Sequence, residues 1–189
     1  MRLLSTTAAL CLAALAAPAP ANEFAPMLRD LAETEIPAVL DSPVLIEAIR
    51  AQNAEHAGID EGRIEELDAE WRAQVGAGEA PLIDAVLGND AAEHLREARE
   101  ASAGLFTEVF VMDASGLTVA ASDVTSDYWQ GDEAKWQRTF PTGEMHIGEI
   151  ELDESTQSYQ SQVSVAIRDP ETREPIGAAT FGVNVEYLQ

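Results

Sequence analysis

The residues best suited to chemistry lie in one stretch, SDVTSDYWQGDEAKWQRTF, at positions 122–140. Tyr128, Trp129 and Trp136 are interleaved there with several acidic side chains and with Lys135. An aromatic face attracts a desolvated organic cation by about 0.5–2 kcal/mol, and a neighbouring carboxylate can neutralise an amine. These residue types in this order favour a pocket for a small charged molecule.

The charge of such a ligand is not fixed by this stretch. Asp127, Asp132 and Glu133 suit the amine group of a small amine or amino acid, which is the preferred class because acidic residues outnumber basic ones here and aromatic rings favour cations. A small carboxylate is the second choice. A carboxylate would instead need Lys135 or Arg138, the two cations of the stretch. An α-amino acid would use groups of both signs. In the competing interpretation, the aromatic rings are core anchors and the charges are solvated.

Catalytic chemistry finds little support in the rest of the chain. Three histidines are far apart in the sequence and form no H-E-x-x-H or similar metal motif: His56, His94 and His146. Ser115 lacks a G-x-S-x-G elbow, and residues 153–157 lack the glycine and the final glutamate of a calcium loop. We expect a protein that is not an enzyme, without catalytic residues, metal or cofactor.

The N-terminal residues predict export. Arg2 precedes an apolar run at residues 3–17, and Ala19-Pro20-Ala21 supplies the small residues that a signal peptidase requires. We expect residues 1–21 to be a cleaved signal peptide, which leaves a periplasmic chain that is not inserted in a membrane. An uncleaved anchor is the alternative. Because cleavage removes the only cysteine, Cys11, we expect neither disulfides nor thiol chemistry in the mature chain.

The formal charge excludes one class of partner. The full chain carries −23 at pH 7, and removal of Arg2 moves the mature chain to about −24. Such a surface repels phosphate backbones, so we expect no nucleic-acid partner.

Helical spacing of apolar residues dominates positions 22–104. Ser42-Pro43 has the form of a helix start, and Asn89-Asp90 can cap a helix over residues 91–101. Another helix is expected at residues 81–87. One further helix would carry a single apolar stripe: Ile64, Leu67, Trp71 and Val75.

From Leu105 the apolar period changes to two, which predicts strands. Two expected strands flank a turn at residues 113–116, and three more follow the 122–140 stretch. This order predicts an α+β fold, a five-stranded antiparallel sheet with a long N-terminal helical segment on one face. We expect residues 22–189 to form a single domain, with the helical lead-in at 22–104 and the sheet and pocket at 105–189.

The last two expected strands have unequal faces. One side carries large apolar residues: Val163, Val165, Ile167, Phe181, Val183 and Val185. The other side carries small or polar residues, among them Gln162, Ser164, Thr180 and Gly182. The simplest interpretation is a bare, solvent-facing side. Because Ala and Gly are unusual on an exposed face, we expect this side to be covered and to leave a cavity.

The succession VFVMDASGLTVAASDVTSDYWQGDEAKW, followed by IGAATFGVNVEYL, resembles the Cache superfamily. The similarity is to the single PAS-like extracytoplasmic sensor modules, also called PDC domains, and extends over most of the chain after the signal segment. It rests on the D-x-x-G turn, the Tyr-Trp-Gln-Gly-Asp-Glu run and the final I-G-A strand. The resemblance implies a small-molecule pocket between the sheet and the segment joining strands two and three, which is here 122–140.

Cache modules usually sit in membrane receptors, and the printed sequence departs from that pattern. It reaches Gln189 without a second apolar span or a cytoplasmic signalling segment. We therefore expect a free periplasmic binding protein, for which a membrane receptor or kinase in the periplasm is a candidate partner.

Together these observations predict a small-molecule binding module of sensor type. Its ligand would be a small amine, amino acid or carboxylate held between the sheet and the 122–140 segment. The expected ligand contacts are Tyr128, Trp129, Asp132, Lys135, Trp136, Ser164 and Thr180. The alternative, from another class, is a partner-docking or structural periplasmic protein with no ligand of its own.

Overall fold

The computed structural model describes residues 22–153 and 157–188. The predicted signal segment, residues 1–21, lies outside the described residues, so its cleavage and the export of the chain stay predictions. Within the described ranges, no helix is long and apolar enough to cross a membrane.

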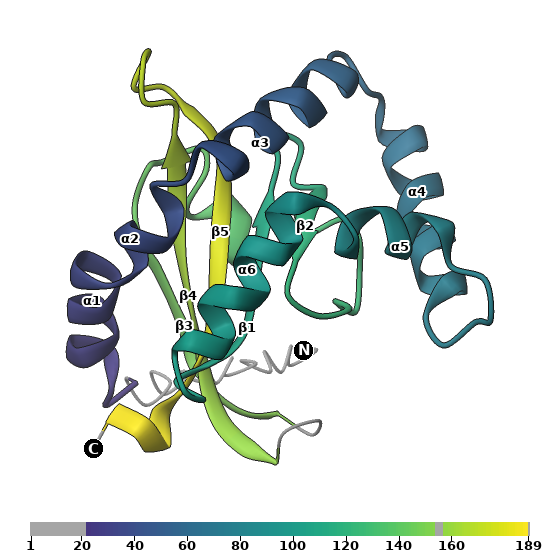
Figure 1. The fold of residues 1–189 in the computed structure, drawn as a ribbon. Helices are drawn as coiled ribbons and strands as arrows, with labels where there is room; N and C mark the ends of the chain where they lie inside the picture. Colours follow the sequence, from purple (N-terminus) through teal and green to yellow (C-terminus); the bar gives the residue numbers. More distant parts are fainter. Residues whose placement is uncertain (1–21, 154–156, 189) are drawn as a thin grey trace, which may run out of the picture.

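Helices make up the first half of the described chain, as the apolar spacing predicts (Figure 1). They are α1 (Ala25–Thr34), α2 (Ile36–Leu40), α3 (Pro43–Glu55), α4 (Glu61–Gln74), α5 (Pro81–Leu87) and α6 (Asp90–Ala101). Pro43 opens α3 and the Asn89 side chain accepts a hydrogen bond from the Ala92 N–H at 2.8 Å, as the sequence predicts. Ser42 stands at the N-cap of α3, but its side chain makes no capping hydrogen bond.

Strands make up the second half, with one short helix between the second and third. The strands are β1 (Phe106–Met112), β2 (Thr118–Ala121), β3 (His146–Asp153), β4 (Ser158–Arg168) and β5 (Pro175–Asn184). The short helix is α7 (Ala134–Gln137), and the 3₁₀ turn η1 (Val185–Leu188) follows β5. The five strands form one sheet in the order β2-β1-β5-β4-β3, and every neighbouring pair is antiparallel. The predicted α+β fold with a PAS-like five-stranded antiparallel sheet is confirmed.

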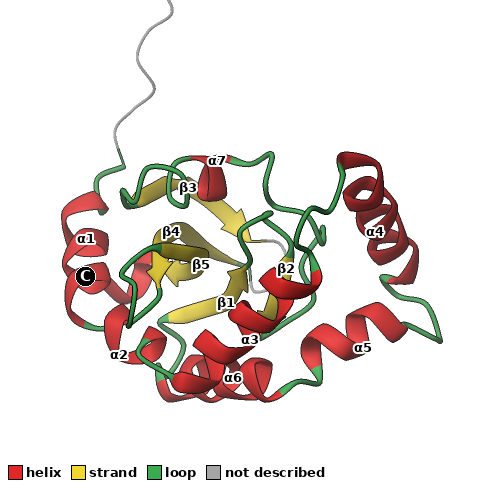
Figure 2. Cartoon of the chain, turned by 90° about the horizontal axis from the view of Figure 1, so that it is seen from above, coloured by secondary structure: helices red, strands yellow, loops and turns green. Residues whose placement is uncertain are grey.

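One face of the sheet packs on the N-terminal helices. Val163, Phe181 and Val183 are fully buried there against α1, α2, α3 and α6. Figure 2 shows these four helices along one side of the sheet and α7 on the opposite side. The large apolar side chains of β4 and β5 therefore supply the main core, as their alternation in the sequence predicts.

Helices α4 and α5 lie beside the sheet and form a second, smaller core (Figure 1). Trp71 of α4 is fully buried in it, with Leu67, Ile83 and Val86, and it contacts Tyr128 of the 122–140 segment. The expected stripe ends early, because α4 stops at Gln74 and the side chain of Val75 is 48% exposed. These two helices therefore support the 122–140 segment, and α5 also packs against β2 of the sheet.

The opposite face of the sheet carries the small and polar residues, and the 122–140 segment covers part of it. Phe110 and Met112 of β1 and Ala178 of β5 are buried under Trp136 and Phe140. The hydroxyls of Ser164 and Thr180, both fully buried, are hydrogen-bonded to each other at 2.9 Å. The segment thus closes this face with aromatic rings and leaves space beside them.

Candidate ligand-binding site

A cavity of about 490 Å³ lies between the small-residue face of the sheet and the 122–140 segment. Its walls come from three places: the end of α6, the strands β1 and β4, and the covering segment. The lining residues are Arg99, Thr107, Glu108, Phe110, Asp123, Val124, Thr125, Ser126, Gln130, Lys135, Gln160 and Gln162. Most of these side chains are polar or charged, so the cavity suits a polar ligand.

Lys135 brings the most enclosed positive charge to this cavity. Its side chain is 14% exposed, and its ammonium donates to Gln130 Oε1 at 2.9 Å and pairs with Glu133 at 3.1 Å. The ammonium also lies 5.4 Å from the centre of the Phe110 ring, which is a cation–π distance. Helix α7 and the floor of the sheet therefore hold this cation in place.

The same cavity is lined by two acidic side chains, one from the sheet and one from the start of the covering segment. Glu108 of β1 accepts a hydrogen bond from Gln162 Nε2 at 3.0 Å. Asp123 forms an ion pair with Arg99 of α6. The cavity thus combines fixed groups of both signs with amide and hydroxyl groups, an arrangement that can neutralise both ends of a zwitterion.

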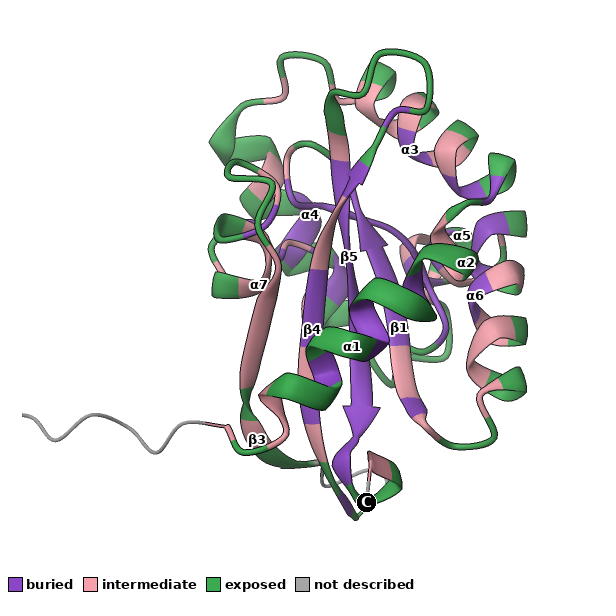
Figure 3. Cartoon of the chain, turned by 90° about the vertical axis from the view of Figure 1, so that its left-hand side faces the viewer, coloured by how far each residue is buried: buried purple, intermediate pink, exposed green. Residues whose placement is uncertain are grey.

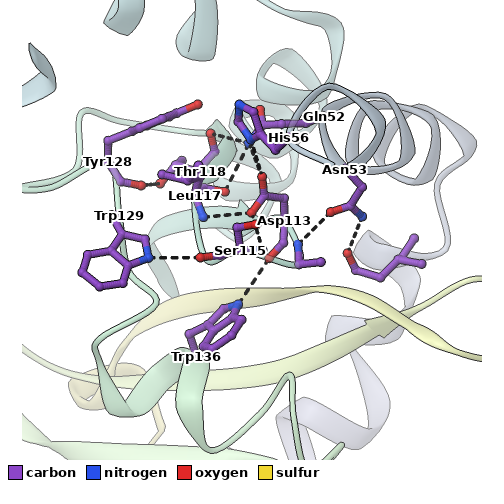
Figure 4. Close-up of polar contacts among 12 residues, drawn as sticks. Gln52, Asn53, His56, Asp113, Ser115, Leu117, Thr118, Tyr128, Trp129 and Trp136 are labelled. Atoms are coloured by element: carbon purple, nitrogen blue, oxygen red, sulfur yellow. Dashed lines mark hydrogen bonds and ion pairs between the residues drawn. The ribbon is translucent and has the colours of Figure 1, made fainter. Parts of the chain in front are cut away.

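A buried carboxylate in the turn between β1 and β2 organises the chain around it (Figure 4). Asp113 is fully buried in the turn between β1 and β2. One of its oxygens accepts the backbone N–H groups of Ser115 at 2.8 Å and Leu117 at 3.0 Å. The other bonds Gln52 Nε2 at 3.0 Å and His56 Nδ1 at 2.8 Å, both from α3. This carboxylate therefore ties the helical layer to the sheet.

The same turn holds the covering segment from its other side. Trp136 Nε1 donates to the Asp113 carbonyl at 3.2 Å, and Trp129 Nε1 donates to the Ser115 carbonyl at 3.0 Å (Figure 4). Gly116 has a φ of +82°, and any Cβ on it would collide with the backbone of Gly131. The glycines of the D-x-x-G and W-Q-G motifs are thus required by the contact between this turn and the segment.

Tyr128 and Trp129, two of the predicted ligand contacts, lie outside the cavity lining. Tyr128 is 4% exposed and stacks on Trp71 with 5.5 Å between ring centres. Burial raises the pKa of its hydroxyl well above the usual range, and the nearby carboxylates of Asp113 and Glu55 add to the shift. Both backbone N–H groups of this pair donate to Asp68 of α4, at 2.9 and 3.0 Å. The geometry favours packing for these two residues.

The other five predicted contacts differ in their position relative to the cavity. Lys135 lines the cavity, whereas Asp132 is exposed and is not part of its lining. Trp136 is half-buried in the covering segment, stacked on Phe140 at 5.1 Å and in contact with the cluster that contains Phe110. Ser164 and Thr180 lie in the sheet next to Phe110, which pairs with Thr180, and they support the floor. Of the seven predicted contacts, Lys135 alone is part of the lining.

Several lining residues were not predicted. The sequence offers a signal for two of them: Gln162 falls on the small-residue side of β4, and Glu108 occupies an alternating position in β1. For Arg99 and Thr125 the sequence contains no pattern that predicts a place in the lining. Arg99 enters through the end of α6, and Thr125 is held in place when its carbonyl accepts a hydrogen bond from Trp71 Nε1 at 2.9 Å. Contacts between residues so far apart in the chain leave no local pattern in the sequence.

A second hollow of about 330 Å³ adjoins the cavity and shares Lys135 and Gln162 with it. His146 of β3 lies in its wall, and burial lowers the pKa of this imidazole, with Arg138 adding to the shift. This lowered pKa favours the neutral form of the imidazole. Among the described residues, no group of three or more His, Cys, Asp or Glu side chains is placed to hold a metal ion.

No protein-family model and no curated protein matches the chain. Solved structures with a similar arrangement include the ligand-binding domain of the Campylobacter jejuni chemoreceptor Tlp3 in complex with 4-methylisoleucine. It has a TM-score of 0.42 and 12% identity, and the match covers 85% of this chain and 64% of that one. The ligand-binding domain of the Pseudomonas aeruginosa amino acid chemoreceptor PctC, in complex with GABA, has a TM-score of 0.43 and 19% identity, with 68% and 54% covered.

The sensor domain of the Vibrio cholerae histidine kinase DctB is a third such structure, with a TM-score of 0.37, 12% identity, and 86% and 57% covered. This chain thus spans less than two thirds of the length of each of the three. At these TM-scores and identities the comparisons carry no ligand or activity to this chain. The resemblance to the single Cache, or PDC, sensor domains therefore rests on the sequence motifs, and the structure shows the α+β fold with a five-stranded antiparallel sheet that this resemblance implies.

Proposed function

We propose that this protein is a periplasmic sensor-type module that binds a small zwitterion, with an α-amino acid as the preferred class, in the 490 Å³ cavity. The observation that supports the proposal most strongly is the enclosed ammonium of Lys135 in a wall that also contains Glu108 and Asp123. Residues 22–189 would form the binding domain, and its liganded form would be presented to a membrane receptor or kinase.

The energetics favour a ligand with both charges. A simple carboxylate would pair with Lys135 but would also face the carboxylates of Glu108 and Asp123. A simple amine would pair with Glu108 or Asp123 but would also face the ammonium of Lys135. A zwitterion satisfies both signs, and the amides of Gln130, Gln160 and Gln162 can bond its remaining polar atoms, which avoids the cost of burying unpaired groups. Ser164 and Thr180 would keep the floor rigid beneath it, and Trp136 would hold the covering segment on the sheet.

Replacing Lys135 with Gln should weaken the binding of such a ligand by roughly 10- to 100-fold, because a charge-assisted hydrogen bond contributes about 1.5–3 kcal/mol. Affinity would be measured by calorimetric titration with the amino acid that most raises the melting temperature in a panel of amino acids, amines and carboxylates. The same panel includes the amide and the deaminated analogue of each amino acid.

The matched control is Arg29→Gln, which removes one cation from the exposed surface of α1, away from the cavity. It should leave affinity unchanged. If Lys135→Gln and Arg29→Gln bind alike, Lys135 is no ligand contact. If no compound of the panel stabilises the wild-type protein, the alternative of a docking or structural protein is favoured.

A further inference from the structure

A groove on the opposite, helix-covered face of the sheet has the features of a second binding site. Its volume is about 350 Å³, within the common range of about 300–1,000 Å³ for small-molecule sites. The walls come from α1, α2, the start of α3 and strand β4, and the mouth lies at the turn after β4. Figure 3 shows α1 and α2 in front of the sheet on this side.

The groove exists because α2 covers the sheet incompletely. Val163 and Val165 point to the same face of β4, yet Val163 is fully buried and Val165 is only half-buried. Ile36 and Leu40 of α2 and Ile46 of α3 form the facing wall. Because α2 has only five residues, it leaves some apolar side chains of the strand and helices uncovered, and a ligand could contact them.

The mouth of the groove is positive in a chain whose net charge is −23. Arg168 and Arg173 both line it, and neither forms an ion pair with any described residue. Two of their acidic neighbours are already engaged, because Arg50 pairs with both Asp169 and Glu171. Glu174 follows Arg173 in the chain but does not line the groove, and the Arg168 guanidinium donates to the Arg173 carbonyl at 3.2 Å. By contrast, most other cations of the described chain are paired with carboxylates: Arg50, Arg63, Arg72, Arg96, Arg99 and Lys135.

We propose that this groove binds a small amphipathic anion, a molecule with an apolar body and one carboxylate or equivalent group, independently of the zwitterion cavity. The apolar body lies against Ile36, Ile46 and Val165, and the anionic group lies at the mouth beside Arg173. Asp41 also lines the groove, so the charged lining residues, two arginines and one carboxylate, sum to one positive charge. This excess suits a monoanion and disfavours a cation.

Octanoate is the probe that tests this inference, with octylammonium and octanol as matched compounds of the same chain length. Titrations would be followed by backbone amide shifts in NMR spectra of the protein from residue 22 onward. Octanoate should bind more tightly than octylammonium and should shift Ile36, Ile46 and Val165, with Glu108 and Gln162 unchanged. Each methylene added from hexanoate to octanoate should tighten binding by up to about fourfold, because its burial contributes about 0.8 kcal/mol.

Two charge variants should act in opposite directions. Arg173→Gln should weaken octanoate binding by roughly two- to fivefold, the range for an exposed ion pair, and Asp41→Asn should tighten it by a similar factor. Val165→Phe should block the groove without a change of charge. If this variant lowers the melting temperature, Ile46→Phe fills the same space from the helix side.

Three outcomes would overturn the inference. Octylammonium could bind as tightly as octanoate, the shifts could cluster at Glu108 and Gln162, or both filling variants could keep full affinity. Because the zwitterion cavity lies on the other face of the sheet, Lys135→Gln should leave octanoate binding unchanged. Failure of either site is therefore distinguishable from failure of the other.

Discussion

Replacement of Asp113 with Ala should lower the free energy of unfolding by about 3–5 kcal/mol, because the buried charge holds donors from two layers of the fold. Its carboxylate bonds Gln52 and His56 of α3 and two backbone N–H groups of its own turn. Without it, these buried groups lose their acceptor, and the turn loses the conformation to which Trp129 and Trp136 are bonded. Urea unfolding followed by circular dichroism measures the effect.

The matched control is Asp113→Asn, which keeps the size of the side chain and one acceptor oxygen. It should cost less than the alanine variant, since Ser115 and Leu117 can still donate to the amide oxygen. An alanine variant as stable as the wild type would show that the turn is held by other contacts. Equal losses in the two variants would show that charge, rather than hydrogen-bond geometry, is what the site requires.

Replacement of Trp71 with Ala should cost about 3–5 kcal/mol, the usual range for removal of a fully buried tryptophan. The indole fills the small core beside the sheet, stacks on Tyr128 and donates to the Thr125 carbonyl. The milder variant Trp71→Phe keeps an aromatic ring and removes that hydrogen bond. Because Thr125 lines the cavity, Trp71→Phe should also weaken ligand binding.

Thermal unfolding and calorimetric titration of both variants give the two readings. A loss of stability in Trp71→Ala together with a loss of affinity in Trp71→Phe is expected. If Trp71→Phe binds the ligand as the wild type does, α4 does not position the cavity wall. If Trp71→Ala melts at the wild-type temperature, the second core contributes little to stability.

The fold could be predicted because its signals are local. The change of apolar period near Leu105 marks the border between helices and strands, and caps such as Asn89 mark single helix ends. The alternation within β4 and β5 identifies which face meets the helices, since a strand side chain can point only to one side or the other. Each of these signals depends on residues a few positions apart.

The site could be predicted only in outline, because its details depend on contacts distant in sequence. Aromatic residues interleaved with charged ones are compatible with a pocket wall and with a small core. Which of the two they form depends on the residues that they contact in the fold. Trp71 of α4 stacks on Tyr128, and Asp68 of α4 accepts the backbone N–H groups of Tyr128 and Trp129. Neither contact could be inferred from the 122–140 stretch itself. The buried pair of His56 and Asp113 was likewise not predicted, because 57 positions separate the two residues.

A crystal structure of the protein with its best-stabilising amino acid bound tests the central claim most directly. We expect the ligand between the sheet and residues 122–140, with its carboxylate within hydrogen-bond distance of Lys135 Nζ and its amine facing Glu108 or Asp123. The surrounding amides of Gln160 and Gln162 should bond its remaining polar atoms. A ligand bound on the helix-covered face, or one that leaves Lys135 without contact, would contradict the account.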